Sequence, residues 1–193
     1  MSGFNCIIVG VGGQGTVLAS RLLAQAAINK GWHAATAETI GMAQRGGTVV
    51  GHLKCGEHIF SPLLALGTAD LLIGFEPAET VRALPYLKNG GAIVVNKTPV
   101  MPFDPDSKYS GSAELDFLRQ QVAKLYIADG DLICQNCGTG KVLNIALLGE
   151  AVRAGFLPFS ILDLEVAMEQ MLPEKLIAIN IKAINGTKNK NIV

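Results

Sequence analysis

Short, almost continuously apolar runs alternate along this chain with longer segments in which apolar residues recur every three or four positions. Continuous runs of this kind predict strands that are buried on both faces of a sheet, and the three clearest are FNCIIVG, ADLLIGF and AIVVN. The segment QGTVLASRLLAQAAINKG places its leucines on one helical face and stops at Gly31, which predicts a helix. The chain therefore opens with a strand followed by a helix.

The remaining segments continue this alternation of strands and helices, with one exception. The second strand, WHAATAE, runs into the glycine-containing loop TIGMAQRGGT instead of a helix, and the alternating segment TVVGHLKCG then predicts a further strand that ends in a turn at Gly56. A short strand is expected at LYIAD, and helices are expected at 76–91, 113–124, 141–154, 160–171 and 173–186. This order predicts an α/β fold, with one Rossmann-like domain over residues 1–193, three layers and a mostly parallel sheet.

The amino-acid composition indicates that part of the surface contacts another subunit. The residue types AVILMFWYC make up 49% of the 193 residues, a further 22 residues are glycine, and only 17% are charged. In an average soluble domain about 45–50% of residues are apolar with glycine included, and about 25% are charged. A buried parallel sheet accounts for part of the surplus. We expect the remainder to lie in a contact with another subunit, and a homodimer of the isolated chain is left open.

Charge and the length of the apolar runs exclude several classes of partner. Sixteen basic and sixteen acidic residues cancel, so the chain has no general attraction for nucleic acid or for an anionic membrane surface. No apolar run reaches the roughly 20 residues of a membrane-spanning helix, and the first expected strand begins too close to Met1 for a signal peptide. We therefore expect a cytoplasmic protein whose four cysteines are reduced.

The glycine turn after the first strand allows two hypotheses. Gly10, Gly12 and Gly15 have the G-x-G-x-x-G spacing of a dinucleotide-binding turn, and Glu38 ends the second strand where an acid that binds the ribose of NAD would stand. These residues suit a free-standing NAD- or FAD-binding protein. A Rossmann half, however, continues from its second strand into a helix, and this chain does not. The other hypothesis is that the N–H groups of the turn face another anion or a neighbouring subunit.

Three motifs in a fixed order resemble the gamma domain of the 2-oxoacid:ferredoxin oxidoreductase family. They are GVGGQGTVLASRLLAQAA, ETIGMAQRGGTVVGHLKCG and ADLLIGFEPAETVRALPYLKNGG, and the similarity resumes in GKVLNIALLGEA and AINIKAING. The pairing of GGQG with GMAQRGG carries the resemblance, which covers most of the chain. The chain is most similar to the beta-subunit type of the indolepyruvate enzymes. Gamma subunits of the pyruvate, 2-oxoglutarate or branched-chain oxoacid enzymes are the alternative within the family.

The resemblance implies that the chain works as one subunit of a larger enzyme. In this family a 2-oxoacid is oxidatively decarboxylated to an acyl-CoA, and the electrons pass to ferredoxin. The indolepyruvate branch would use aryl pyruvates. Thiamine diphosphate and iron–sulfur clusters belong to a partner alpha subunit, and CoA binds in the full complex, so no cofactor is expected on this chain. The isolated chain is expected to be inactive.

Two glycine-flanked segments form the candidate site for a ligand or a partner. Arg45 can donate a fork of hydrogen bonds to a phosphate or carboxylate, with Gln44 as a second donor, or it can pair with a carboxylate or carbonyl at a subunit contact. Both segments leave strands at the carboxyl edge of the predicted sheet, so we expect them to be neighbours in space. The predicted site residues are Gly12, Gly13, Gln14, Gly15, Gln44, Arg45 and Gly46.

The other residue types that carry chemistry do not form a predicted active site. Cys134 and Cys137 have a C-x-x-C spacing that suits ordinary thiols, a redox pair or half of a metal site, and ordinary thiols are the expectation. His52 is expected to be a packed histidine, with a role in the site as the alternative. Glu76 and Glu79 are expected to stabilise a helix N-terminus. The sequence therefore assigns no catalytic residue and no metal ligand.

Overall fold

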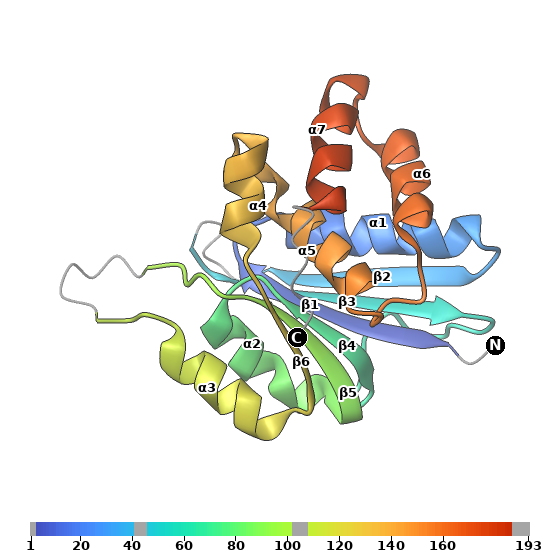
Figure 1. Ribbon diagram of the computed structural model, residues 1–193. Coiled ribbons are helices and arrows are strands. Elements are labelled where there is room, and N and C mark those ends of the chain that lie inside the picture. Colours follow the sequence, from blue (N-terminus) through green and yellow to red (C-terminus); the bar gives the residue numbers. More distant parts are fainter. Residues whose placement is uncertain (1–2, 41–45, 102–107, 187–193) are drawn as a thin grey trace.

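The computed structural model describes residues 3–40, 46–101 and 108–186. At its centre lies a six-stranded sheet with the strand order β2-β3-β1-β4-β5-β6 (Figure 1). The strands are β1 (Phe4–Val11), β2 (His33–Ile40), β3 (Thr48–Gly56), β4 (Ala69–Gly74), β5 (Leu87–Asn96) and β6 (Lys124–Ala128).

The sheet is mostly parallel, with one reversed strand near its edge. Strands β1, β4, β5 and β6 pair in parallel, whereas β3 runs antiparallel to both of its neighbours, β1 and β2. Strand β2 therefore points in the same direction as β1 but is separated from it by β3. A Rossmann half places its second strand directly beside the first. Here β3, the next strand along the chain, takes that place and pairs antiparallel with both β1 and β2.

Helices cover both faces of the sheet. In the described part of the chain they are α1 (Thr16–Asn29), α2 (Pro77–Ala83), α3 (Ser112–Gln121), α4 (Gly130–Cys137), α5 (Leu143–Arg153), α6 (Ile161–Met171) and α7 (Glu174–Asn185). Figure 1 shows α2 and α3 below the sheet and the other helices above it. The three-layer α/β fold that the sequence predicts is therefore confirmed.

The side chains of β1 alternate between two hydrophobic cores. Cys6 and Ile8 belong to the core on the side of α1, and Ile7 and Val9 belong to the core on the side of α2. All four residues are at most 1% exposed. Because successive side chains of a strand point to opposite faces, a strand covered on both sides must be apolar at every position. This explains why CIIV, the fully covered part of β1, is an unbroken apolar run.

Two segments differ from the sequence prediction. The helix expected at 76–91 ends at Ala83, and a 3₁₀ turn at Leu84–Tyr86 leads directly into β5. Pro85 explains the early end, because proline has no N–H with which to continue the helical hydrogen bonds, and the chain passes into a 3₁₀ turn there. Helix α4 was not expected. Its N-cap is Asp129, whose side chain accepts a hydrogen bond from the N–H of Leu132.

Candidate functional site

The glycine turn after β1 adopts a backbone that few residues other than glycine can adopt. Gly13 and Gly15 have φ angles of 103° and 83°, in a region that L side chains rarely enter. A Cβ atom built on Gly13 would meet no described atom within 4 Å, so this part of the turn is open to its surroundings. Gly15 is the N-cap of α1 and provides no side chain for the first N–H groups of that helix. The turn is therefore a bare helix N-terminus with an open side.

Gln14 holds the turn against the ends of two strands. Its Oε1 accepts a hydrogen bond from the N–H of Val11 at 2.7 Å, and its Nε2 donates to the carbonyl of Phe75 at 3.1 Å. The amide thereby ties the end of β1 to the residue that follows β4. The sequence predicts that Gln14 binds a ligand or a partner. In the structure both ends of its amide are already bonded to the chain's own backbone.

Asn144 supports the turn from α5. Its Nδ2 donates to the carbonyl of Gly15 at 3.3 Å, and the residue is only 3% exposed. A Cβ atom on Gly15 would lie 2.6 Å from this Nδ2, closer than such contacts occur. The φ angle thus favours glycine at position 15, and a larger residue there would also displace the side chain of Asn144. The sequence predicts only a helix around Asn144 and not this contact, because the contact spans 129 positions of the chain.

We call the segment GMAQRGG, residues 41–47, the arginine loop; its described end, Gly46 and Gly47, lies beside the glycine turn. The N–H of Gly12 donates to the carbonyl of Gly47 at 2.8 Å, and Val11 pairs with Thr48 across β1 and β3. For their described residues, this confirms the expected proximity of the two segments. Gly46 is exposed and has a φ angle of 80°. Gln44 and Arg45, the two predicted donors, lie outside the described residues.

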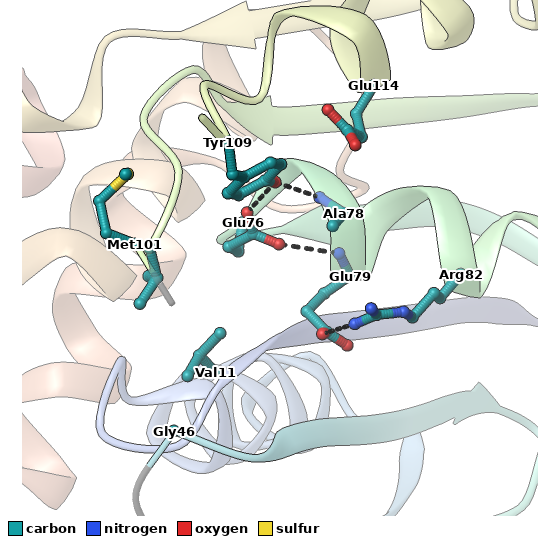
Figure 2. A pocket seen from close by; sticks show the side chains of 10 residues that line it. Val11, Gly46, Glu76, Ala78, Glu79, Arg82, Met101, Tyr109 and Glu114 are labelled. Atoms are coloured by element: carbon teal, nitrogen blue, oxygen red, sulfur yellow. Dashed lines mark hydrogen bonds and ion pairs between the residues drawn. The ribbon is translucent and has the colours of Figure 1, made fainter. Parts of the chain in front are cut away.

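A pocket of about 390 Å³ opens at the same edge of the sheet, and we call it the carboxyl-edge pocket. Val11 and Gly46 form one side of it, α2 forms another, and Met101, Tyr109 and Glu114 close the remainder (Figure 2). Its volume lies in the lower part of the roughly 300–1,000 Å³ range of small-molecule sites. The sequence does not predict this pocket, because its residues come from segments far apart in the chain.

Glu76 organises the wall of this pocket. It is 3% exposed and is the N-cap of α2, where its Oε2 accepts the N–H of Glu79 at 2.9 Å. Its Oε1 accepts the hydroxyl of Tyr109, which in turn accepts the N–H of Ala78 (Figure 2). Burial and the hydrogen bond to Glu76 raise the pKa of Tyr109 well above its ordinary value. Tyr109 therefore remains a hydroxyl donor, and the expected helix-capping role of Glu76 is confirmed.

Glu79 is arranged differently from Glu76. Its Oε1 pairs with the guanidinium of Arg82, but its Oε2 is buried and receives no hydrogen bond from the described residues. The Glu79 side chain is 6% exposed, whereas that of Arg82 is 67% exposed. A buried carboxylate oxygen without a donor is unfavourable, because it loses its hydration without replacement. Glu79 is therefore an incompletely satisfied acidic group in the pocket wall.

The structure disfavours a dinucleotide site at the glycine turn. Glu38, the candidate ribose-binding acid, accepts a hydrogen bond from Ser20 of α1 at 3.0 Å. In a dinucleotide site, the acid that binds the ribose stands at the end of the strand directly beside the one that leads into the glycine turn. Here β3 lies between β2 and β1, so the strand that carries Glu38 is not adjacent to β1. Both observations favour the second hypothesis, in which the turn serves another ligand or a subunit contact.

The remaining candidates are packed residues. His52 is 4% exposed, and its Nδ1 accepts the N–H of Leu64 at 3.2 Å, as expected for a packed histidine. Cys134 and Cys137 lie on α4 as free thiols. Burial raises the pKa of Cys134 to about 11, so this residue is a thiol and not a reactive thiolate at neutral pH. Within the described residues, no cluster of three or more histidine, cysteine or acidic side chains could hold a metal ion.

Comparison with known proteins assigns the family. The family model described as pyruvate ferredoxin/flavodoxin oxidoreductase matches residues 5–188. The chain belongs to this family. Within the pyruvate ferredoxin/flavodoxin oxidoreductase family, it is 32% identical over 192 residues to the indolepyruvate oxidoreductase subunit IorB of Archaeoglobus fulgidus, with 97% of this chain and 95% of the relative covered. It is 25% identical to the pyruvate/ketoisovalerate oxidoreductases common subunit gamma of Thermococcus kodakarensis, with 95% of each chain covered.

A solved structure of a family subunit has the same fold. The gamma subunit of a keto/oxoacid ferredoxin oxidoreductase from Geobacter sulfurreducens matches with a TM-score of 0.70 and 22% identity, over 95% of this chain and 93% of that one. At this identity the likeness shows the fold alone. Membership of the family confirms the resemblance that the paired glycine motifs indicated.

Proposed function

We propose that this chain is the small subunit of an indolepyruvate:ferredoxin oxidoreductase. The complete enzyme oxidatively decarboxylates an aryl pyruvate to an acyl-CoA and passes the electrons to ferredoxin. The observation that carries the proposal is the match to an indolepyruvate oxidoreductase subunit over nearly the whole of both chains, at 32% identity. The match to a subunit shared by pyruvate and ketoisovalerate enzymes covers 95% of each chain but reaches only 25% identity. A pyruvate, 2-oxoglutarate or branched-chain substrate is therefore the second candidate.

In this proposal the cofactors are bound outside the chain. Thiamine diphosphate and the iron–sulfur clusters belong to the alpha subunit, CoA binds in the complex, and ferredoxin meets the assembled enzyme. The placement of the cysteines supports this division. Cys6, Cys55 and Cys134 are buried among apolar residues of one core, whereas a cluster requires cysteines that converge on its iron atoms.

The contact with the alpha subunit, or with an anionic ligand that it holds, is placed at the glycine turn and the arginine loop. The residues are Gly12, Gly13, Gln14, Gly15, Gln44, Arg45 and Gly46. The open side of Gly13, the exposure of Gly46 and the hydrogen bond from Gly12 to Gly47 support this placement. Gln14 contributes by fixing the turn. A single domain over residues 1–193, a cytoplasmic location and a homodimer in isolation remain predictions.

Substrate preference of the complex tests the proposed function. The chain is co-expressed with its alpha subunit, and the purified complex is assayed for ferredoxin reduction with CoA and one of five acids: indolepyruvate, phenylpyruvate, pyruvate, 2-oxoglutarate or 2-oxoisovalerate. We expect the two aryl pyruvates to give the highest kcat/KM. A preference of tenfold or more for another acid would assign the chain to the second candidate. A complex that oxidises none of the acids would contradict both.

A further inference from the structure

The carboxyl-edge pocket is acidic, although it lies beside the turn that a G-x-G-x-x-G spacing would assign to an anion. Among the described residues that line it, Glu76, Glu79 and Glu114 carry carboxylates and Arg82 carries the one guanidinium. Three carboxylates against one cation repel phosphate and carboxylate groups. The pocket itself is thus suited to a cation, and an anionic ligand of the glycine turn has to bind outside it.

The unpartnered oxygen of Glu79 specifies what kind of cation fits. It is a hydrogen-bond acceptor, so it requires an N–H or O–H donor or a metal ion. A metal is not supported, because the described residues present no cluster of three ligands. A nitrogen cation with several N–H groups can satisfy the Glu79 oxygen and also approach the neighbouring Glu76 carboxylate. The guanidinium of arginine suits such a site better than an ammonium, because it is planar, has five donors and is more weakly hydrated.

Arg82 does not already complete the site. It contacts one oxygen of Glu79, and two thirds of its side chain is exposed, which makes the pair weak and easily displaced. Rotation about the last torsion of a glutamate side chain is soft and roughly twofold, so the two oxygens of Glu79 can exchange places. In either orientation one of the two oxygens lacks a donor, and a second guanidinium entering the pocket can supply it.

We propose that the carboxyl-edge pocket binds the guanidinium of an arginine side chain of the alpha subunit, with Glu79 as the principal acceptor. This inference rests on the proposed function, because it requires the subunit partner. Charge complementarity carries it: the pocket contains an excess of carboxylate, lies at the edge of the sheet beside Val11 and Gly46, and contains a buried oxygen to which no described residue donates a hydrogen bond.

Association of the variants with the alpha subunit tests the proposal. We expect Glu79→Gln to weaken binding by about thirtyfold or more, as happens when one partner of a buried charged pair is truncated. Glu169→Gln, on the exposed face of α6, is the matched control and should leave binding unchanged. Arg82→Gln should strengthen binding a few-fold, because it removes the competing guanidinium. Weakening by Arg82→Gln to the same extent as by Glu79→Gln would show a merely structural ion pair and overturn the proposal.

A small-molecule probe separates failure of the pocket from failure of the proposed function. Titration of the isolated, isotope-labelled full chain with N-ethylguanidinium should shift the amide resonances of Ala78 and Glu79, and Glu79→Gln should abolish these shifts while circular dichroism shows a folded chain. Absence of the shifts in the parent chain overturns the pocket proposal, even if the subunits associate. Failure of the parent chain to bind the alpha subunit overturns the proposed function instead.

Tighter probe binding in Arg45→Ala would show that the chain's own arginine fills the pocket and would overturn the assignment to the partner.

Discussion

His52 shows how one buried polar group can carry a measurable pH dependence. The residue is 4% exposed, its Nδ1 accepts the N–H of Leu64, and its ring stands edge-on to that of Tyr86 with ring centroids 5.4 Å apart. Burial, together with the nearby positive charge of Lys54, lowers its pKa from the ordinary value of 6.5. The folded chain therefore requires the neutral imidazole, because protonation would replace the acceptor with a donor that faces the N–H of Leu64.

Acidification should reduce stability through His52. Between pH 6.5 and the lower pKa of the folded state, the unfolded chain binds a proton that the folded chain does not, so the free energy of unfolding falls as the pH falls. Above about pH 7.5 both states are neutral and the contribution disappears. The change His52→Asn keeps an acceptor near the position of Nδ1 but does not titrate. The melting temperature of this variant should decline less between pH 7.5 and 5 than that of the parent.

The control for this experiment is His58→Asn, because His58 is exposed. Its pH profile should follow the parent profile. If His52→Asn and the parent lose stability in parallel over the same pH range, the acid sensitivity arises elsewhere, and the account of His52 is wrong.

At the scale of elements, the close approach of α5 and α7 depends on Gly149. A Cβ atom built at this position would lie 2.2 Å from the carbonyl oxygen of Ile184. The same carbonyl accepts a hydrogen bond from Arg153 at 2.7 Å, and Arg153 also pairs with Glu150 at 2.8 Å. A backbone atom cannot rotate away as a side chain can, so any residue larger than glycine has to push α7 away from α5.

Gly149→Ala should therefore destabilise the chain, although alanine favours helices. Overpacking at a well-packed contact costs about 1–3 kcal/mol, more than the up to about 1 kcal/mol by which alanine exceeds glycine in helix propensity. Chemical denaturation measures the difference. Gly140→Ala is the matched control, because a Cβ atom there meets nothing within 4 Å and should change stability by less than about 0.5 kcal/mol. Equal effects of the two substitutions would contradict the packing argument.

The sequence predicts the elements better than their contacts. Strands covered on both faces leave unbroken apolar runs, and for this reason β1 and β4 can be recognised from composition alone. Pro85 is present in the sequence as a helix breaker, but where β5 begins depends on its pairing with β4, which no local pattern records. The same limit applies to the site. The glycines at 12–15 are local, whereas the support of Gly15 by Asn144 and of Glu76 by Tyr109 depends on the tertiary fold.

At the scale of the whole molecule, the surface of the described residues is consistent with a subunit that works in a complex. The segment between β3 and β4 exposes three large apolar side chains: Phe60 at 98%, Leu66 at 65% and Leu63 at 55%. Grouped apolar side chains on a surface often mark contacts with other proteins. Among the described helices none is long and apolar enough to cross a membrane. The three exposed apolar side chains agree with the subunit contact that the apolar composition predicts.

The most direct test of the central claim is a titration of the isolated chain into a fixed amount of the isolated alpha subunit. Ferredoxin reduction is followed with indolepyruvate and CoA present. Because thiamine diphosphate and the clusters are proposed to lie on the alpha subunit while this chain completes the enzyme, each subunit alone should be almost inactive. The rate should rise with added chain and then saturate. A rate that does not change when the chain is added, or full activity of either subunit alone, would contradict the account.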